Sequence, residues 1–315
     1  MSNNQLRSEH RRFQSFLRNP LLKLQIIGSL LVTASIAQGA YWGCLHAQEE
    51  TVSSSAPAPQ EVWFSSEKPK QGETVEVELR MPAAVPPPPV EFNKESYKFF
   101  PFQAEGGTIY KALFTVPVVM KPGAKSVKIG STTRNITVLD AHYPVQRMTL
   151  PPSKNNFNTA PGEEEAIDGA KGTVSAERFW KGNFQAPSAA RVSAGFGLRR
   201  IVNGKLLDDY FHSGLDFAGG IGSPVAACAP GKVLLAVSKG FKLHGNTVAI
   251  DHGQGVVSFY IHLSKVLVKE GQMVKQGEKI GAIGQTGRAN GPHLHFSIYV
   301  NKVASTPWQW FRKAH

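Results

Sequence analysis

Short stretches of alternating apolar and polar residues dominate the chain after residue 60. In residues 61–140, four of them are separated by turns rich in glycine and proline: TVEVELRM, KALFTVPVV, KSVKIG and RNITVLD. Strict alternation is the period of a half-buried β-strand, and several short strands at close spacing are typical of a β-sandwich. We therefore predict a chain that is mainly β, with a β-sandwich-like module over residues 61–140.

Residues 187–315 show the same alternation, and here it places histidines opposite an apolar face. His293 and His295 are two residues apart, and Leu294, Phe296 and Ile298 alternate with them. Side chains two apart in a strand share a face. We expect both histidines to point the same way, with a hydrophobic core behind them, in a C-terminal β-sheet domain.

A second polar pair, His212 and Asp216, follows the same rule if the chain is extended there. Residues four apart in a strand share a face, and Leu215 and Phe217 take the opposite direction. The two pairs can then converge on one metal ion. His262, in FYIHLS between them, is a further candidate.

Two imidazole nitrogens and one carboxylate suit Zn²⁺, and three protein ligands leave a fourth position for water, as in catalytic zinc sites. Zinc lowers the pKa of a bound water to about 7 and polarises a carbonyl, which predicts peptide hydrolysis. Each histidine alone would more often be an ordinary strand or turn residue. Their joint presence in one region favours a metal site, although spacing does not decide which of His293 and His295 binds the metal.

Five segments of the C-terminal region occur in the order found in one enzyme family: SAGFGLRR, HSGLDFA, GNTVAIDHGQG, YIHLS and VKQGEKIGAIGQTGRANGPHLHFSIY. Over residues 187–301 the chain resembles the lysostaphin-like, LytM-type zinc metallopeptidases. The resemblance implies that His212, Asp216 and His295 bind zinc. It also implies that His262 and His293 act on the reacting groups.

The resemblance further implies a substrate, the peptide stems or cross-links of peptidoglycan. The segment YPVQRMTLPP is similar to a connector in Gram-negative members with an N-terminal β-module, which implies a periplasmic enzyme and a D-alanyl–meso-diaminopimelate bond as its target. Glycyl-glycine bridges are the choice of other members. Some members have lost metal ligands and only activate other wall hydrolases, so a non-hydrolytic activator of a separate amidase is the alternative.

In the mechanism we expect, one of His262 and His293 takes or relays a proton from the attacking water, and the other steadies the developing charge or protonates the leaving amine. The sequence leaves their order open. Arg199 and Asn246 are candidates to line the groove and contact substrate carboxylate or backbone.

The N-terminal residues have the form of an export segment. Five basic residues precede an uncharged run, residues 24–47, that is rich in Leu, Ile, Val and Ala. We predict an export signal over residues 1–47, cut after Ala47 or near residues 37–40. An uncleaved inner-membrane anchor through residues 24–47 is the alternative. Residues 48–60 are rich in Ser, Ala and Pro and predict a flexible linker.

Charge and cysteine content fit an exported, cell-envelope protein. The chain has 35 basic and 23 acidic side chains; residues 1–47 hold five and one of these, so the rest keeps 30 minus 22, a net charge of +8. Such a charge favours anionic polymers such as the cell wall. The basic residues form no stripe with interleaved aromatics, which argues against nucleic acid as a partner. Without residues 1–47, Cys228 stands alone, and we expect it to be a small buried residue.

Residues 141–186 are predicted to connect the two modules. Their acidic run, Glu163 to Glu165, is interpreted as a solvated face or a helix start. Trp180 and Phe184 are expected to fix the connector to a domain.

Overall fold

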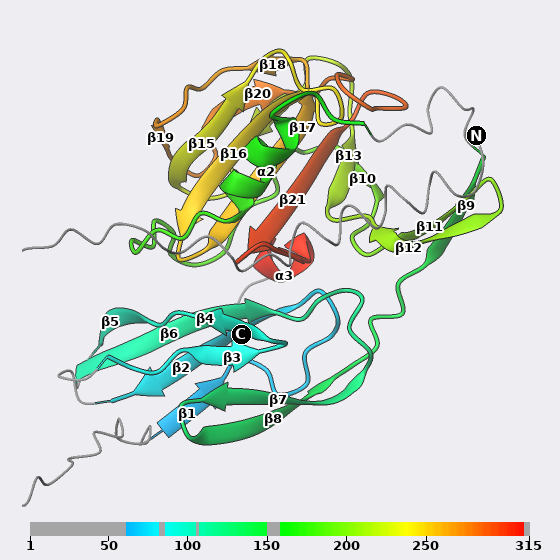
Figure 1. The fold of residues 1–315 in the computed structure, drawn as a ribbon. Coiled ribbons are helices and arrows are strands. Elements are labelled where there is room, and N and C mark those ends of the chain that lie inside the picture. Colours follow the sequence, from blue (N-terminus) through cyan, green and yellow to red (C-terminus); the bar gives the residue numbers. More distant parts are fainter. Residues whose placement is uncertain (1–60, 82–85, 105–106, 150–157, 312–315) are drawn as a thin grey trace, which may run out of the picture. The chain divides into compact units, whose positions relative to one another are not determined.

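The structure, a computed structural model, describes residues 61–81, 86–104, 107–149 and 158–311. The predicted export segment, the linker over residues 48–60 and residues 312–315 lie outside this range. Within it, the chain forms strands with two short helices (Figure 1). None of the described helices is long and apolar enough to cross a membrane. The described residues belong to one compact unit, residues 54–315.

The first eight strands form two four-stranded sheets, with the orders β1-β2-β6-β5 and β4-β3-β7-β8. Alternation sets the buried face, as in β2, where Val75, Val77 and Leu79 are fully buried. Side chains of both sheets join one hydrophobic cluster, which is the sandwich that the sequence predicts. The strands are β1 Glu61–Phe64, β2 Thr74–Arg80, β3 Val90–Phe92, β4 Glu95–Tyr97, β5 Phe100–Ala104, β6 Gly107–Thr115, β7 Gly123–Ile129 and β8 Thr132–Val138.

The later strands form three sheets. The largest has eight strands in the order β10-β13-β21-β17-β16-β15-β19, with β22 paired to β21; the smaller sheets are β12-β11-β9 and β14-β20-β18. The strands are β9 Val145–Met148, β10 Arg191–Ala194, β11 Arg199–Val202, β12 Lys205–Phe211, β13 Leu215–Ala218, β14 Pro224–Ala226, β15 Gly231–Val237, β16 Asn246–Gly253, β17 Val256–Leu263, β18 Lys265–Val266, β19 Met273–Val274, β20 Lys279–Ala282, β21 Leu294–Val300 and β22 Val303–Ser305.

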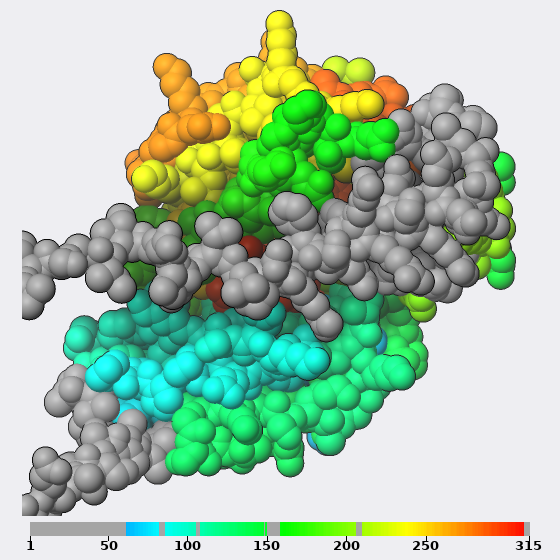
Figure 2. Space-filling view, viewed as in Figure 1, coloured from blue at the N-terminus to red at the C-terminus, as the bar shows by residue number. Residues whose placement is uncertain are grey.

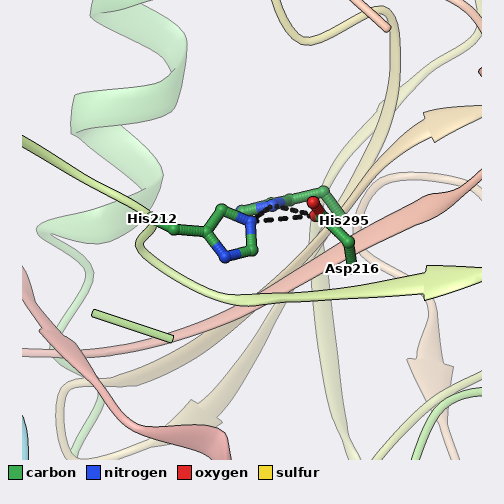
Figure 3. Close-up of side chains that lie close together, drawn as sticks. All are labelled: His212, Asp216 and His295. Carbon is green, nitrogen blue, oxygen red and sulfur yellow. Dashed lines mark hydrogen bonds and ion pairs between the residues drawn. The ribbon is translucent and has the colours of Figure 1, made fainter. Parts of the chain in front are cut away.

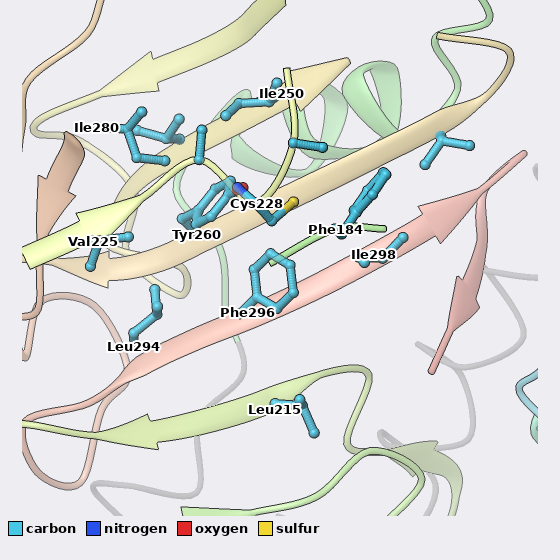
Figure 4. Close-up of a cluster of buried hydrophobic side chains, with 14 of the residues drawn as sticks. Phe184, Leu215, Val225, Cys228, Ile250, Tyr260, Ile280, Leu294, Phe296 and Ile298 are labelled. Carbon is cyan, nitrogen blue, oxygen red and sulfur yellow. The ribbon is translucent and has the colours of Figure 1, made fainter. Parts of the chain in front are cut away.

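One face of the eight-stranded sheet packs on the main hydrophobic core (Figure 4). As the alternation predicts, Leu215, Leu294, Phe296 and Ile298 are fully buried there, and Phe217 is 3% exposed. Phe184 and Trp180 of the connector join this core and contact Trp310, in the short helix α3 (Pro307–Phe311). The expected fixing of the connector by its aromatic residues is therefore confirmed.

The helix α2 (Glu163–Lys171) covers part of the other face of the same sheet. Its Ile167 and Ala170 are buried against Ala249, Val257 and Phe259 of β16 and β17. In the space-filling view, the bright green residues of this segment lie on the surface against the yellow strands (Figure 2). Because both faces of β17 are covered, all eight of its residues are buried.

Two side chains with polar atoms, Cys228 and His252, are buried in the interior of the C-terminal fold. Cys228 is free and fully buried, as expected, and burial raises the pKa of its thiol to about 12. His252 is also fully buried, in β16: its Nδ1 lies 2.7 Å from the carbonyl oxygen of Pro230 and its Nε2 lies 2.7 Å from the hydroxyl of Ser258. The ring of His252 is thus part of the packed interior.

This burial predicts a pH dependence of stability. Burial lowers the pKa of His252 from 6.5 to about 4, so between these values the unfolded chain binds one more proton than the folded chain. The free energy of unfolding should then fall by about 1.4 kcal/mol per pH unit as the pH drops from 6.5 to 4. We expect His252→Gln to have a lower free energy of unfolding than the wild type at pH 7. Its free energy of unfolding, measured with urea, should also fall less steeply between pH 7 and pH 5. Equal slopes would contradict this account.

Candidate metal centre and cleft

Three side chains from three separate parts of the C-terminal fold meet at one point. His212 directly follows β12, Asp216 lies in β13 and His295 lies in β21. Asp216 and His295 are direct partners in the antiparallel pairing of β13 with β21, which places their side chains side by side on one face. The sequence prediction that the two pairs converge is confirmed, although His212 and Asp216 do not share one strand, because a turn separates them.

The ligand atoms of the three side chains face one another (Figure 3). His212 Nε2 lies 2.9 Å from Asp216 Oδ1 and 2.9 Å from His295 Nδ1, and His295 Nδ1 lies 2.9 Å from Asp216 Oδ1. His212 is only 3% exposed, and the other two are partly buried. The group is compact enough for one ion to reach all three atoms, since zinc bonds to nitrogen and oxygen are about 2.0–2.2 Å long.

The hydrogen bond on the far side of the His212 ring decides what this group can hold. Nδ1 lies 2.7 Å from the carbonyl oxygen of Gly195, and a carbonyl only accepts, so Nδ1 carries the proton. A neutral ring then presents the Nε2 lone pair to the Asp216 carboxylate, and two acceptors at 2.9 Å repel each other. A cation between them removes the repulsion, and a carbonyl that orients the ring of a ligand histidine is the usual outer support of such a site.

The protonation states of the group fit a cation as well. Burial raises the pKa of Asp216, but the neighbouring imidazoles of His212 and His295 outweigh it and hold the pKa far below its usual range. Burial lowers the pKa of His295, against the opposing effect of the Asp216 carboxylate. An ionised carboxylate beside an imidazole that resists protonation is the state in which both groups bind a metal.

Gly214 leaves the space for this arrangement. A Cβ on this residue would collide with the backbone oxygen of Phe296 and lie 3.0 Å from Nε2 of His295. The turn between His212 and Asp216 therefore passes directly over β21. A glycine is required there because the backbone of the turn touches the strand that carries the third side chain.

His262 reaches the same face through a β-bulge. Ile261 lines the cleft, so strict alternation along β17 would point its neighbour His262 to the opposite side, towards the core. Between Leu263 and Tyr260, however, β17 holds one more residue than β16, and His262 has a φ of 65°. Bulges re-aim side chains, and left-handed non-glycine residues cluster at functional sites. The His262 ring lies beside that of His293, with centroids 4.8 Å apart.

Both of these rings are oriented by backbone carbonyls. His262 Nδ1 lies 2.9 Å from the carbonyl oxygen of Thr286, and His293 Nδ1 lies 2.8 Å from that of Gly291. Nδ1 of each ring therefore donates, and the remaining Nε2 of a neutral ring is an acceptor. Burial, reinforced by His295 and His293, lowers the pKa of His262 to about 3. His262 is thus neutral at pH 7 and can accept, not donate, a hydrogen bond at Nε2.

The three clustered residues His212, Asp216 and His295 line one open cleft of about 490 Å³, together with His262 and His293. Its floor consists of outward-facing residues of β17 and β21, such as Phe259, Ile261 and Ser297. Ile167 and Lys171 of α2 also line it, so the connector helix contributes to the cleft. Arg199 and Asn246, the candidate substrate contacts, are not among the lining residues, and Arg199 is exposed to solvent.

Comparison with known proteins agrees with this geometry. Residues 210–307 match the model of a family described as Peptidase family M23. These residues form an M23 peptidase domain. They contain His212, Asp216, His262, His293 and His295.

Three relatives show how far the likeness extends. The peptidoglycan DD-endopeptidase ShyB of Vibrio cholerae is 41% identical over 112 residues, 35% of this chain and 25% of its own length. The DD-carboxypeptidase/endopeptidase Mpg of Neisseria meningitidis is 41% identical over 117 residues, 37% of this chain and 26% of its own length. The match thus spans about a quarter of these relatives.

The third relative is a solved structure. A Pseudomonas aeruginosa protein described as a candidate peptidase M23 is 27% identical with a TM-score of 0.58, and the likeness covers 79% of this chain and 96% of that one. The likeness therefore reaches well beyond residues 210–307.

Three residues that line the M23 cleft, Arg200, Tyr210 and Arg288, escape the sequence prediction. Arg200, not Arg199, lines the cleft, because neighbours along β11 face opposite sides. Tyr210 and Arg288 lie in the same lining. Alternation along β11 predicts that Arg200 faces the cleft only if the side of the strand that faces the cleft is already known.

The sequence prediction also misplaces Glu163. It is fully buried, so the solvated face is wrong for this residue, while the helix start is confirmed. Its carboxylate accepts hydrogen bonds from the backbone N–H groups of Lys242, Leu243 and His244 at 2.7, 3.0 and 2.8 Å. It also accepts one from Ala160 N–H at 2.8 Å. The spacing of Glu163, Ile167 and Ala170, three and four apart, is the signal that all three share the inner face of α2.

This carboxylate fixes a loop that supports the cleft. The carbonyl oxygen of His244 accepts the backbone N–H of His262 at 3.0 Å, and the His244 ring Nδ1 lies 2.8 Å from Glu163 Oε1. Burial raises the pKa of Glu163, but the hydrogen bonds from Ala160, His244 and Lys242 lower it to about 2. A buried, ionised glutamate thus connects α2 to the strand that carries His262.

We expect Glu163→Gln to loosen this loop. Both oxygens of the carboxylate accept hydrogen bonds, whereas in the amide group only the oxygen does. The loss of charge-assisted hydrogen bonds should lower the free energy of unfolding by about 2 kcal/mol or more and speed amide hydrogen exchange at residues 242–244. The difference should shrink from pH 4.5 towards pH 2, because protonation of Glu163 removes the same bonds.

The matched control is Glu164→Gln, one residue along the same helix and exposed. It should leave both stability and exchange at wild-type values. Equal effects of the two substitutions would contradict the role assigned to Glu163.

Proposed function

We propose that this protein is a zinc-dependent endopeptidase that hydrolyses peptide bonds in peptidoglycan. The observation that carries the proposal is the triangle of His212 Nε2, Asp216 Oδ1 and His295 Nδ1, with 2.9 Å sides, at the base of an open cleft in an M23 domain. The set of two imidazoles and a carboxylate fits zinc, and it leaves room for a fourth ligand. The names of the relatives, which include peptidoglycan DD-endopeptidases, support the substrate class.

His212, Asp216 and His295 are the residues that would hold the metal. When bound in such a site, zinc lowers the pKa of a water molecule and polarises a carbonyl group. The carbonyl of Gly195 keeps the His212 ring in the tautomer that exposes Nε2. The pairing of β13 with β21 fixes the other two side chains on a rigid sheet.

His262 and His293 are the residues that would handle protons. Both rings have Nδ1 bound to a backbone carbonyl, so Nε2 is the working atom. A neutral His262 accepts a hydrogen bond from the attacking water and orients it. His293 Nε2 lies 3.9 Å from Asp216 Oδ1, next to the metal ligands, where it can take a proton and pass it to the leaving amine. A pKa of about 3 for His262 favours orientation over full proton abstraction for that residue.

The finer assignments rest on the relatives and on the N-terminal sequence. The Vibrio cholerae relatives are named DD-endopeptidases, which favours a bond between D-amino acids, of which the D-alanyl–meso-diaminopimelate cross-link is our candidate. A peptidoglycan substrate places the enzyme in the periplasm or elsewhere in the cell envelope. Export or anchoring through residues 1–47 agrees with that location.

The first test is the zinc content of purified variants. His212→Ala, Asp216→Ala and His295→Ala should weaken zinc binding by more than the roughly 10- to 100-fold typical of outer-sphere changes. His262→Ala and His293→Ala should retain about one zinc per chain and lose turnover by about 10²- to 10⁴-fold. Atomic absorption after dialysis measures the metal. Similar zinc loss in all five variants would refute this division of roles.

The second test identifies the bond. Purified peptidoglycan is digested with the zinc-loaded protein, with and without a chelator, and the muropeptides are analysed by mass spectrometry. We expect cross-linked dimers to disappear and monomers with a new diaminopimelate amine to appear, only without chelator. An unchanged profile from protein that carries one zinc would instead favour the non-hydrolytic activator of an amidase.

A further inference from the structure

Two arginines and a tyrosine form a cluster in the lining of the cleft. Arg200 comes from β11, Tyr210 from β12 and Arg288 from the loop between β20 and β21. Arg200 Nη1 donates a hydrogen bond to the Tyr210 hydroxyl at 3.3 Å, and its guanidinium group lies 5.6 Å from the centre of the Tyr210 ring. Arg288 also forms a hydrogen bond with Tyr210. We call these three residues the arginine–tyrosine cluster.

The electrostatics of the cluster favour an anion. Burial lowers the pKa of Arg288, and the positive charge of Arg200 acts in the same direction, against the effect of Tyr210. Two partly buried guanidinium groups therefore lie close enough to repel each other. An anion between them would turn the repulsion into attraction, because like charges are tolerated where a counter-charge is shared.

An unsatisfied hydrogen-bond donor of Arg200 also favours a bound anion. Its Nε is buried and has no hydrogen-bond partner among the described residues. Buried polar groups in native proteins are rarely left without a partner, so an unpaired one needs an explanation such as a functional role or a bound water or ion. Packing of Arg200 on the Tyr210 ring explains the position of the guanidinium group, but it gives Nε–H nothing to bind.

The chemistry of guanidinium selects the ligand. Its planar fork of N–H groups matches the two oxygens of a carboxylate, and the peptides of the cell wall carry free carboxylates beside their cleavable bonds. We propose that Arg200, Tyr210 and Arg288 form a subsite that binds a carboxylate of the peptide substrate. The inference rests on the proposed endopeptidase function and adds a specificity element to it.

The experiment compares two synthetic cross-linked muropeptides that differ in one group, the free carboxylate of the diaminopimelate residue or its amide. With the wild-type protein, kcat/KM should be about tenfold or more lower for the amidated peptide, mainly through KM, because a charge-assisted contact is lost. This comparison changes only the substrate, so it does not depend on the folding of a variant.

Variants then locate the effect. Arg200→Gln and Arg288→Gln should lower kcat/KM for the carboxylate peptide by a similar factor and leave the amidated peptide almost unaffected, with zinc content unchanged. Arg147→Gln is the matched control, because Arg147 lies in β9 of the same three-stranded sheet, is exposed and does not line the cleft. It should keep the wild-type preference.

The outcomes separate the two proposals. Cleavage of both peptides at equal rates would overturn the carboxylate subsite and leave the endopeptidase function standing. Loss of the preference in Arg147→Gln as well would also overturn it, because the effect would then reflect general charge. Cleavage of neither peptide by zinc-loaded wild-type protein would overturn the endopeptidase function and the subsite with it.

Discussion

The site depends on the backbone pairing that sets Asp216 against His295. Direct partners across an antiparallel pair hold their side chains a fixed short distance apart, and here the partners are an ionised carboxylate and an imidazole with a lone pair to share. His212 then closes the group from a turn that only Gly214 allows. A collection of acceptors this dense is unfavourable by itself, so the sheet must be stable enough to enforce it. The buried residues of β17 and β21 provide that stability.

Departures from regular sheet geometry aim the other cleft residues. The bulge at the end of β17 turns His262 towards His293, and a second bulge in β10 lies at Ser193, whose hydroxyl donates to the backbone oxygen of Asp216. A bulge inserts one residue and thereby reverses the face of the residues after it. The regular strands thus position Asp216 and His295, and the irregular positions at their ends position His262 and Ser193.

This division explains how much could be predicted from the sequence. Alternation identifies the mainly β class, the buried faces of β13 and β21 and the shared face of His293 and His295, because each depends on local period. It fails where tertiary contacts decide: the bulge at His262 has no local signature, and the spacing that places Glu163 on the inner face of α2 does not predict that its carboxylate is fully buried. The choice of Arg199 over Arg200 fails for the same reason, since alternation says that the two differ but not which one faces the cleft. The separate roles of His293 and His295 come from the family resemblance, because two residues that share a face cannot be told apart by spacing.

The helix α2 has a consequence for where the folding unit begins. It lies upstream of the residues that match the M23 family, yet its inner face covers Ala249, Val257 and Phe259, and its first residue holds the loop beside His262. A fragment that started at residue 187 would leave an apolar strip of the central sheet open to water, next to its own active cleft. Such a strip is a surface on which copies of the fragment would stick together. The folding unit is therefore larger than the segment that matches the M23 family, and the shorter piece is expected to aggregate when it is expressed.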